Sequence, residues 1–432
     1  MSRSHSDRGM DRRNFMKSVS LAGIAGLILP RRALAASSAG NSRVIILDDT
    51  AATSGTTINA SVVQSMISSG IRSLGQRSDV GEAWKALLPG VTATSKIGIK
   101  VNCINSSMSS HPAVANAVAN TLMQMTFNGT PFPANNVIIF ERCEAELTGA
   151  GYKINTSATG VRCFATDTAG VGESAETYDV AGVPQNLSRI VTEIIDILIN
   201  LAILKHHSGC GVTLCLKNHF GTVGWPPSLH GNYVNPYAAA LSNVGPIKAK
   251  QKVNIIDALY GIRTGGPDGP PQFAAKTIIM STDIVATDYW GRQLLADNGC
   301  TETVYAGYID VAATTYGLGT NDPANMDVVR IHNPSTMGVE PVTVPGKVQL
   351  YQNFPNPFNP STYIQFDLDR PRDVRLRVVD LAGRVVQTLV DGPMPAGAHK
   401  LFFDGRNLAS GAYICELEAA GRRFFQKMIL MK

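Results

Sequence analysis

Three lysines and two asparagines are the residues of this sequence best suited to bind an anion. Lys100 and Asn102 stand at the end of one apolar run, Lys205 follows another, and Lys217 and Asn218 come shortly after it. Ammonium groups backed by amide donors suit a carboxylate or a phosphate. We therefore predict a site for a small anionic ligand in which Lys100, Asn102 and Asn218 bind the substrate.

A histidine beside these lysines adds acid–base chemistry. His207 has an ordinary pKa of about 6.5, so it can act as a general acid or base near neutral pH. A lysine near other cations has its pKa lowered and can act as a base or a nucleophile. We predict that Lys205, His207 and Lys217 are catalytic and that His230 binds substrate. The alternative for His219 and His230 is a structural role.

Two loops are candidates for the walls of this site. Residues 265–271, GGPDGPP, favour neither helix nor strand and can bring backbone amides close to a ligand. We therefore predict that Gly266 and Gly269 bind substrate; a plain turn is the alternative. The loop lacks the Lys-Ser/Thr ending of a P-loop and the order of a dinucleotide fingerprint. Trp225, with the two prolines that follow it, forms either a pocket wall or a packed surface loop.

Acidic residues and a histidine allow a second kind of chemistry. Glu141, Asp257 and Asp283, with His111, are candidates to ligate a divalent metal, which is a possible cofactor. Asp283 and Asp288 can instead cap the helix that follows them, and His111 can be a helix cap or a surface residue. The sequence holds no C-x-x-C and therefore no iron–sulfur motif.

Nucleophilic catalysis by serine or cysteine has less support. The sequence contains no G-x-S-x-G elbow. Cys210 beside His207 is a conceivable nucleophile, although buried cysteines are usually inert. The seven cysteines are odd in number, so at least one stays unpaired, and we expect Cys210 and Cys215 to be buried rather than paired.

Short apolar runs must position these residues. Each run ends abruptly in polar residues, and near-continuous apolar runs of this length are typical of strands covered on both faces. The runs are 96–101, 137–140, 197–204, 253–256 and 277–280. Helix-compatible stretches lie between them at 111–126 and 186–195, and a single helix over 187–204 is the alternative to a strand from about residue 197. The order predicts an α/β fold with a mostly parallel, doubly wound sheet, in which ligands bind beyond the carboxyl ends of the strands.

The chain changes character at residues 346–432. Prolines punctuate 355–360, which excludes a helix or a central strand there. Val374, Leu376 and Val378 alternate with arginines, as in a strand with one buried face. With turn signals at regular spacing, the pattern predicts a small all-β antiparallel sandwich.

Specific motifs run through this C-terminal stretch. They are YQNFPNPFNP at 351–360, DLAGR at 380–384, NLASGAY at 407–413 and KMIL at 427–430. The stretch resembles the type A C-terminal sorting domain of proteins that leave the cell through the type IX secretion system. The resemblance implies the type IX secretion machinery as a partner and the cell surface or the extracellular space as the destination.

The first 35 residues have the order of an export signal. The string RRNFMK at 12–17 precedes an apolar run at 19–29 and the small residues Ala-Leu-Ala at 33–35. The run is shorter than the ~20 residues that span a bilayer, which disfavours a membrane anchor. The segment resembles a twin-arginine signal peptide, which implies the twin-arginine translocase as a partner and passage through the periplasm. No later apolar stretch is long enough without charges to span a membrane.

The central region carries motifs of its own. They are KVN at 100–102, HP at 111–112, LKHH at 204–207, GVTLCLKNHFG at 211–221, Asp257, GGPDGP at 265–270 and DIVATD at 283–288. Together they resemble the domain-of-unknown-function 362 family over most of residues 43–300. Many relatives carry cysteine-rich ferredoxin motifs, which this sequence lacks. The family has no known reaction.

Composition bounds the function of the whole chain. Its 432 residues allow two or three domains, which we place at 1–35, 36–345 and 346–432. The formal net charge is +5, and residues 1–35 alone hold seven Lys or Arg against two Asp, so no nucleic-acid partner is indicated. We expect an exported, surface-directed protein that acts on a small anionic substrate by Lys/His acid–base or metal-assisted chemistry. The alternatives are a non-catalytic ligand-binding protein and a structural surface module.

Overall fold

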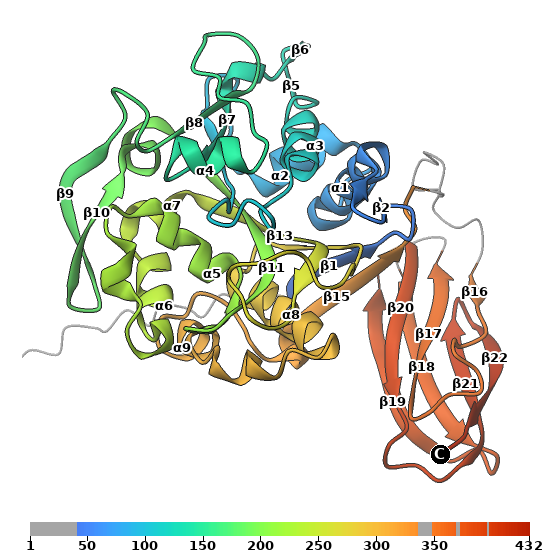
Figure 1. Ribbon diagram of the computed structural model, residues 1–432. Helices are drawn as coiled ribbons and strands as arrows, with labels where there is room; N and C mark the ends of the chain where they lie inside the picture. The colour runs from blue at the N-terminus through green and yellow to red at the C-terminus, as the bar shows by residue number, and fades with distance from the viewer. Residues whose placement is uncertain (1–40, 336–347, 369–371, 395–396) are drawn as a thin grey trace, which may run out of the picture. The chain divides into compact units, whose positions relative to one another are not determined.

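The computed structural model describes residues 41–335, 348–368, 372–394 and 397–432. The expected twin-arginine signal at 1–35 lies outside these residues. Within them the chain forms a mixed α/β region up to residue 335 and an all-β region from residue 348 (Figure 1).

A mostly parallel sheet forms the centre of the α/β region. Eight strands stand in one row: β15 (Met326–His332), β1 (Ser42–Asp48), β14 (Thr277–Ser281), β13 (Gln251–Ile262), β11 (Ile197–His207), β4 (Ile97–Lys100), β7 (Val137–Glu141) and β8 (Arg162–Ala165). A ninth, β12 (Gly211–Thr213), pairs antiparallel with the end of β11. In the row, β14 runs antiparallel to both neighbours and every other pair is parallel. The predicted α/β fold with a mostly parallel sheet is confirmed.

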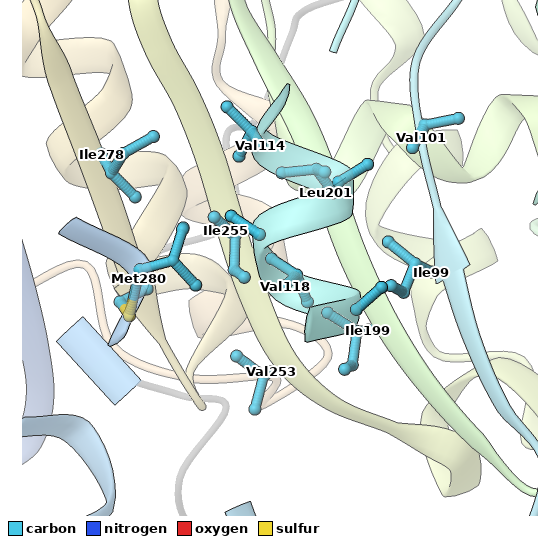
Figure 2. Packing of buried hydrophobic residues seen from close by; sticks show 14 of the residues in the cluster. Ile99, Val101, Val114, Val118, Ile199, Leu201, Val253, Ile255, Ile278 and Met280 are labelled. Atoms are coloured by element: carbon cyan, nitrogen blue, oxygen red, sulfur yellow. The ribbon is translucent and has the colours of Figure 1, made fainter. Parts of the chain in front are cut away.

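Helices cover both faces of this sheet, because its strands are apolar on both sides. One face packs against α1 (Ala60–Gly75), α2 (Val80–Leu87), α3 (Pro112–Leu122) and α4 (Glu144–Gly149). The other packs against α5 (Cys215–Asn218), α6 (Tyr237–Ser242), α7 (Gly245–Lys250), α8 (Ile284–Asp297) and α9 (Tyr308–Thr314). Figure 2 shows Val114 and Val118 of α3 against Ile199, Leu201 and Ile255 of the sheet. The sheet is therefore doubly wound.

The segment before β11 differs from its expected helix. Residues 186–188 belong to β10 (Val183–Ser188), which pairs with β9 (Glu173–Val180), and only Ile190–Ile194 form one turn of π-helix. The side chain of Asn186 donates to the carbonyls of Ser174 and Glu176, so it supports the hairpin rather than a helix. The strand itself begins at Ile197, where we expected it.

The direction of β14 has a consequence for the site. Fourteen residues, 263–276, connect β13 to β14 without a helix, so the two strands pair antiparallel. The carboxyl end of β14 therefore lies at the edge of the sheet opposite the carboxyl ends of β4, β7 and β11. Residues that follow β14 are carried away from that edge.

The all-β region consists of two antiparallel sheets. One contains β16 (Gln349–Leu350), β17 (Ser361–Leu368) and β20 (Gly397–Asp404); the other contains β18 (Arg372–Asp380), β19 (Val385–Met394), β21 (Gly411–Ala419) and β22 (Arg422–Leu430). Val374, Leu376 and Val378 are buried and share one core with Phe366 and Phe403 from the other sheet. The predicted antiparallel sandwich is confirmed.

Short hairpins complete the α/β region: β2 (Thr53–Ser54) with β3 (Thr57–Ile58) and β5 (Thr126–Phe127) with β6 (Thr130–Pro131). All seven cysteines lie among the described residues and none is paired; Cys210 and Cys215 are buried. In the described part of the chain, every helix is too short or too polar to cross a membrane.

Candidate functional site

A cavity opens at the edge of the sheet where β4, β7 and β11 end. It encloses about 260 Å³, and we call it the site cavity. The structure brings to its wall six of the side chains predicted to be catalytic or to bind substrate: Asn102, Lys205, His207, Lys217, Asn218 and His230. They come from the segment after β4, from the end of β11, from α5 and from the loop that follows it. Residues far apart in the sequence thus converge because parallel strands end at the same edge.

Two buried lysines supply the charge of the site cavity. Lys205 is fully buried, and the contact of its Nζ is a long one, 3.4 Å to the carbonyl of Met108. Lys217 is 7% exposed; its Nζ lies 3.2 Å from Nε2 of His230 and 4.5 Å from the ring centre of Phe220. Among the described residues neither ammonium has a carboxylate within ion-pair distance.

Burial and mutual repulsion set the proton affinities of these groups. Burial, with the charge of Lys217 second, lowers the pKa of Lys205 to about 8. Burial also lowers the pKa of Lys217. For His207, burial and the nearby charge of Lys217 lower the pKa to about 3, so its ring is neutral at pH 7.

The neutral rings of His207 and His230 take defined tautomers. Nδ1 of His207 accepts from the backbone N–H of Gly209 at 3.0 Å, which leaves the ring proton on Nε2. In His230 Nδ1 donates to the carbonyl of Pro226 at 2.9 Å, so Nε2 accepts from the ammonium of Lys217. His230 is therefore a support for Lys217, and the two rings lie 6.0 Å apart between their centres.

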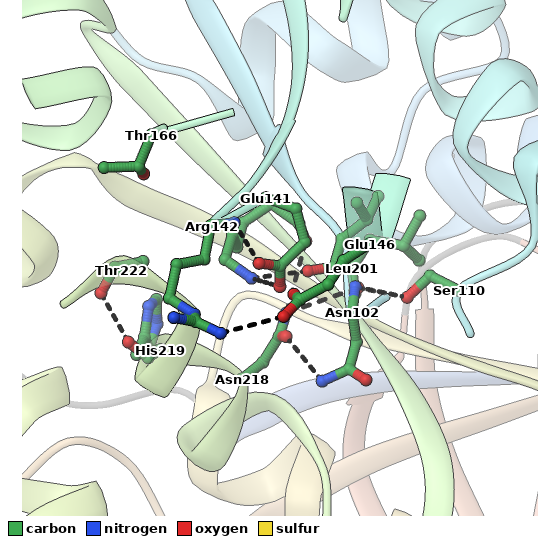
Figure 3. Close-up of polar contacts among 12 residues, drawn as sticks. Asn102, Ser110, Glu141, Arg142, Glu146, Thr166, Leu201, Asn218, His219 and Thr222 are labelled. Carbon is green, nitrogen blue, oxygen red and sulfur yellow. Dashed lines mark hydrogen bonds and ion pairs between the residues drawn. The ribbon is translucent and has the colours of Figure 1, made fainter. Parts of the chain in front are cut away.

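An amide pair forms the floor of the site cavity (Figure 3). The NH₂ of Asn218 donates to the side-chain oxygen of Asn200 at 2.8 Å and faces the carbonyl of Lys100, so its oxygen points to Asn102. Asn102 must then present its NH₂, which donates to that oxygen at 3.2 Å. The oxygen of Asn102 is left buried without a hydrogen-bond partner in the described structure, as is the hydroxyl of Thr213.

Lys100 lies behind this floor rather than in the lining. Its fully buried ammonium pairs with Glu141 at the end of β7 and donates to the carbonyl of Val101 at 2.6 Å. Gly221 crosses above the pair, where a Cβ atom would meet the Lys100 Nζ at 2.6 Å. The expectation that Lys100 binds substrate thus differs from the structure, because its charge is already compensated by Glu141. Burial nevertheless raises the pKa of Glu141, against the opposing charge of Lys100.

The helix that carries Lys217 is held by a buried carboxylate. Asp288 of α8 accepts from the backbone N–H groups of Cys215 and Leu216, at 2.8 and 2.9 Å. Burial raises its pKa to about 7, although these two hydrogen bonds oppose the rise. Asp288 thus fixes the start of α5 rather than capping its own helix.

The candidate metal ligands lie in three separate settings. Glu141 pairs with Lys100, while Asp283 caps α8 by accepting from Ala286 N–H at 2.9 Å, at the opposite edge of the sheet. His111 and Asp257 form a pair at 2.8 Å outside the lining of the site cavity. Burial lowers the pKa of His111, but the Asp257 carboxylate outweighs it, so the pKa lies above its usual value. No three His, Cys, Asp or Glu side chains of the described residues converge as ligands for a metal ion.

The glycine-rich loop also differs from its expected role. The N–H of Gly266 donates to Nδ1 of His206 at 2.9 Å, and the carbonyl of Gly269 accepts from Asn105 at 2.9 Å. Neither glycine lines the site cavity, to which the loop contributes Pro267. The backbone amide that we expected to face a ligand is therefore used within the fold.

Several residues of the site cavity were not predicted from the sequence. Arg142 and Glu146 line it and pair with each other at 2.9 Å, and Thr213 and Phe220 complete its inner wall. Arg142 directly follows the end of β7, so the same strand-end pattern that singled out Glu141 was available for it. Trp225, 68% exposed, lines the opening.

Comparisons with known proteins identify domains within the chain but no reaction. No curated protein matches the sequence. The solved structures that are weakly similar to it include the following three. A protein from Thermotoga maritima is 11% identical, with 50% of this chain and 58% of that chain covered and a TM-score of 0.32. The alkylpurine DNA glycosylase AlkC of Pseudomonas fluorescens, bound to DNA with an abasic site analogue, is 11% identical, covers 34% and 43%, and has a TM-score of 0.15.

The third structure is the endo-β-1,4-mannanase of Thermotoga petrophila, 10% identical, covering 84% and 83% with a TM-score of 0.20. The chain spans little more than half of the Thermotoga maritima protein, and none of these likenesses supports a function. Family models are more specific. Residues 97–293 match the DUF362 domain, a domain of unknown function, and residues 352–431 match the secretion system C-terminal sorting domain, which supports export to the cell surface or the extracellular space.

Proposed function

We propose that the site cavity binds a small anionic substrate and that Lys205, His207 and Lys217 act on it together, with proton transfer at Lys205. One observation carries the proposal: Lys205 and Lys217 are buried in the wall of one cavity, and no carboxylate of the described residues lies within ion-pair distance of either ammonium. Burying an unpaired charge costs several kcal/mol, so such a site is stabilised by an anion that enters it.

The three residues support different parts of this chemistry. Lys205, with a pKa of about 8, can give up and regain a proton near neutral pH, which suits a general acid or base. Lys217 stays hydrogen-bonded to His230 and suits the binding of the anionic group. His207 is neutral and offers its Nε2–H as a donor, while Asn102 and Asn218 orient the ligand from below.

Replacement of both lysines tests the proposal. We expect the variant Lys205→Ala, Lys217→Ala to lose the binding of succinate and inorganic phosphate, measured by isothermal titration calorimetry of the full chain, while its melting curve stays cooperative. Lys248→Met removes an exposed ammonium on α7 and serves as the control, since it should bind as the wild type does. Unchanged binding in the double variant would refute the proposed site.

A non-catalytic binding protein is the second candidate. The low pKa of His207 favours it, because a ring that stays neutral at pH 7 is a poor general base compared with an unperturbed histidine. Proton NMR of each bound anion separates the two: conversion, or exchange of a C–H proton with solvent that requires Lys205, indicates an enzyme. An anion that binds and stays unchanged indicates a binding protein.

The export route forms a further part of the proposal. The RRNFMK string at 12–17 supports passage through the twin-arginine translocase, after which the sorting domain would use the type IX secretion machinery. We expect the substitution of Lys for both Arg12 and Arg13 to keep the precursor in the cytoplasm, as shown by cell fractionation. Normal export of that variant would exclude the twin-arginine route.

A further inference from the structure

We propose that the ligand of the site cavity is a hydroxy acid, a carboxylate that carries a hydroxyl group near its charge. The inference rests on the proposed anion site and deepens it. It comes from the hydrogen-bonding capacity that the fold leaves unused at the cavity wall. That capacity includes one acceptor as well as several donors.

The donors all suit a carboxylate. The Lys205 ammonium has the single long contact to Met108 described above, and Lys217 has His230 as its hydrogen-bond partner, so N–H groups remain on both. His207 adds the Nε2–H of its neutral ring. Two ammonium groups and an imidazole N–H match the several lone pairs of one or two carboxylates.

The unused acceptor is the side-chain oxygen of Asn102. This residue is 8% exposed, and its amide orientation is determined by Asn218, whose own NH₂ is committed to Asn200 and to the carbonyl of Lys100. The oxygen of Asn102 is therefore a buried acceptor without a partner in a residue that lines the site cavity, and a donor on the ligand would satisfy it. The buried hydroxyl of Thr213, which lacks a partner in the described structure, lies in the same wall and can take either role.

Charge decides which donor the ligand carries. The two acidic residues of the lining are both compensated, since Glu141 pairs with Lys100 and Glu146 pairs with Arg142. The charges of Lys205 and Lys217 remain. An ammonium on the ligand would be repelled by both lysines, whereas a neutral hydroxyl can donate to Asn102 without that cost.

The size of the site cavity is consistent with a small hydroxy acid. A volume of about 260 Å³ lies just below the roughly 300–1,000 Å³ of sites for drug-sized ligands, so the site cavity suits a small ligand. Phe220 and the exposed Trp225 give the cavity an apolar side, against which the carbon chain of such a ligand can pack.

A matched series of anions tests the inference. Succinate, malate and aspartate differ only at one carbon, which bears hydrogen, hydroxyl or ammonium. We expect isothermal titration calorimetry of the full chain at pH 7 to show one enantiomer of malate binding about tenfold tighter than succinate, and aspartate binding more weakly than succinate. Equal affinity for malate and succinate, or tightest binding of aspartate, would overturn the hydroxyl while leaving the anion site intact. No binding of any of the three would overturn both proposals.

Two variants localise the effect. Asn102→Ala and Thr213→Val should each abolish the preference for malate, so that malate and succinate bind to the same variant with affinities that agree within about twofold. Asn102→Ala also removes the hydrogen bond to Asn218, so its melting curve must be recorded alongside its affinities. If Asn102→Ala does not fold, Thr213→Val tests the assignment alone, because valine keeps the shape of the threonine side chain. An unchanged malate preference in the folded variants would overturn the assignment.

Discussion

Lys205 should lower the stability of the ligand-free protein, because burying an ammonium without an ion-pair partner costs free energy. Its ammonium is fully buried and unpaired by any described carboxylate, so the folded state binds the proton of Lys205 more weakly than the unfolded chain does. We predict that Lys205→Met, which keeps an unbranched side chain of similar length, stabilises the ligand-free protein at pH 7 while it abolishes anion binding.

The size of the effect follows from the pKa of Lys205. The pKa lies at about 8 in the folded state against 10.5 ordinarily. The difference, at about 1.36 kcal/mol for each pH unit, gives about 3 kcal/mol at pH 7. Because the folded pKa is lowered, the destabilisation is complete below pH 8 and disappears as the pH rises toward 10.5. Wild type and variant should therefore converge in stability near pH 10.5.

Tryptophan fluorescence during thermal unfolding measures this prediction. The three tryptophans, Trp84, Trp225 and Trp290, all lie in the α/β region, so they report its unfolding and not that of the sandwich. We expect Lys205→Met to raise the melting temperature at pH 7 by roughly 6 °C, at about 2 °C for each kcal/mol, and Lys248→Met to leave it unchanged. A variant that is less stable than the wild type at pH 7 would refute the view of Lys205 as an uncompensated buried charge.

Three further predictions concern pH and the supports of the site. Succinate affinity should fall as the pH rises above about 8, where Lys205 loses its proton. Calorimetry in buffers of different ionisation enthalpy should then show that succinate binding takes up a proton. A succinate affinity that stays constant from pH 7 to 10 would count against the role of Lys205. Asp288→Asn should lower the free energy of unfolding by about 1–3 kcal/mol and weaken succinate binding, because α5 loses an acceptor at its start; normal melting and binding would show that Asp288 does not support α5. His111→Asn should destabilise the protein more at pH 5.5 than at pH 9. Asp257 raises the pKa of His111 in the folded protein, so the stabilisation by this pair is present below the pKa of the unfolded state and is lost as the pH rises through the pKa of the folded state. Equal destabilisation at both pH values in thermal melts would contradict this.

Much of the fold could be predicted from the sequence, because a sheet covered on both faces needs apolar strands. The runs at 137–140 and 197–204 therefore stood out. Strand direction is a different matter, since an apolar run looks the same in both directions. The connection 263–276 decides the direction of β14, because it returns the chain without a crossover helix and so places Asp283 at the edge of the sheet opposite the site. The sequence of residues 186–188 is compatible with a helix, but these residues form part of β10 because they pair with the distant strand β9.

The site was predictable as far as it follows from strand ends. Lys205 and His207 lie at the carboxyl end of β11, and α5, which follows the short strand β12, brings Lys217 to the same edge of the sheet. Long-range pairing was not predictable: Lys100 is neutralised by Glu141, 41 residues away, and Asp288 holds α5 from 73 residues away. Neither partnership leaves a local pattern in the sequence.

A crystal structure of the full chain with bound malate would test the central claim most directly. We expect a carboxylate of malate within ion-pair distance of both Lys205 and Lys217, with its hydroxyl directed to Asn102. Malate bound at another place, or a site cavity that stays free of it at saturating concentration, would contradict the account.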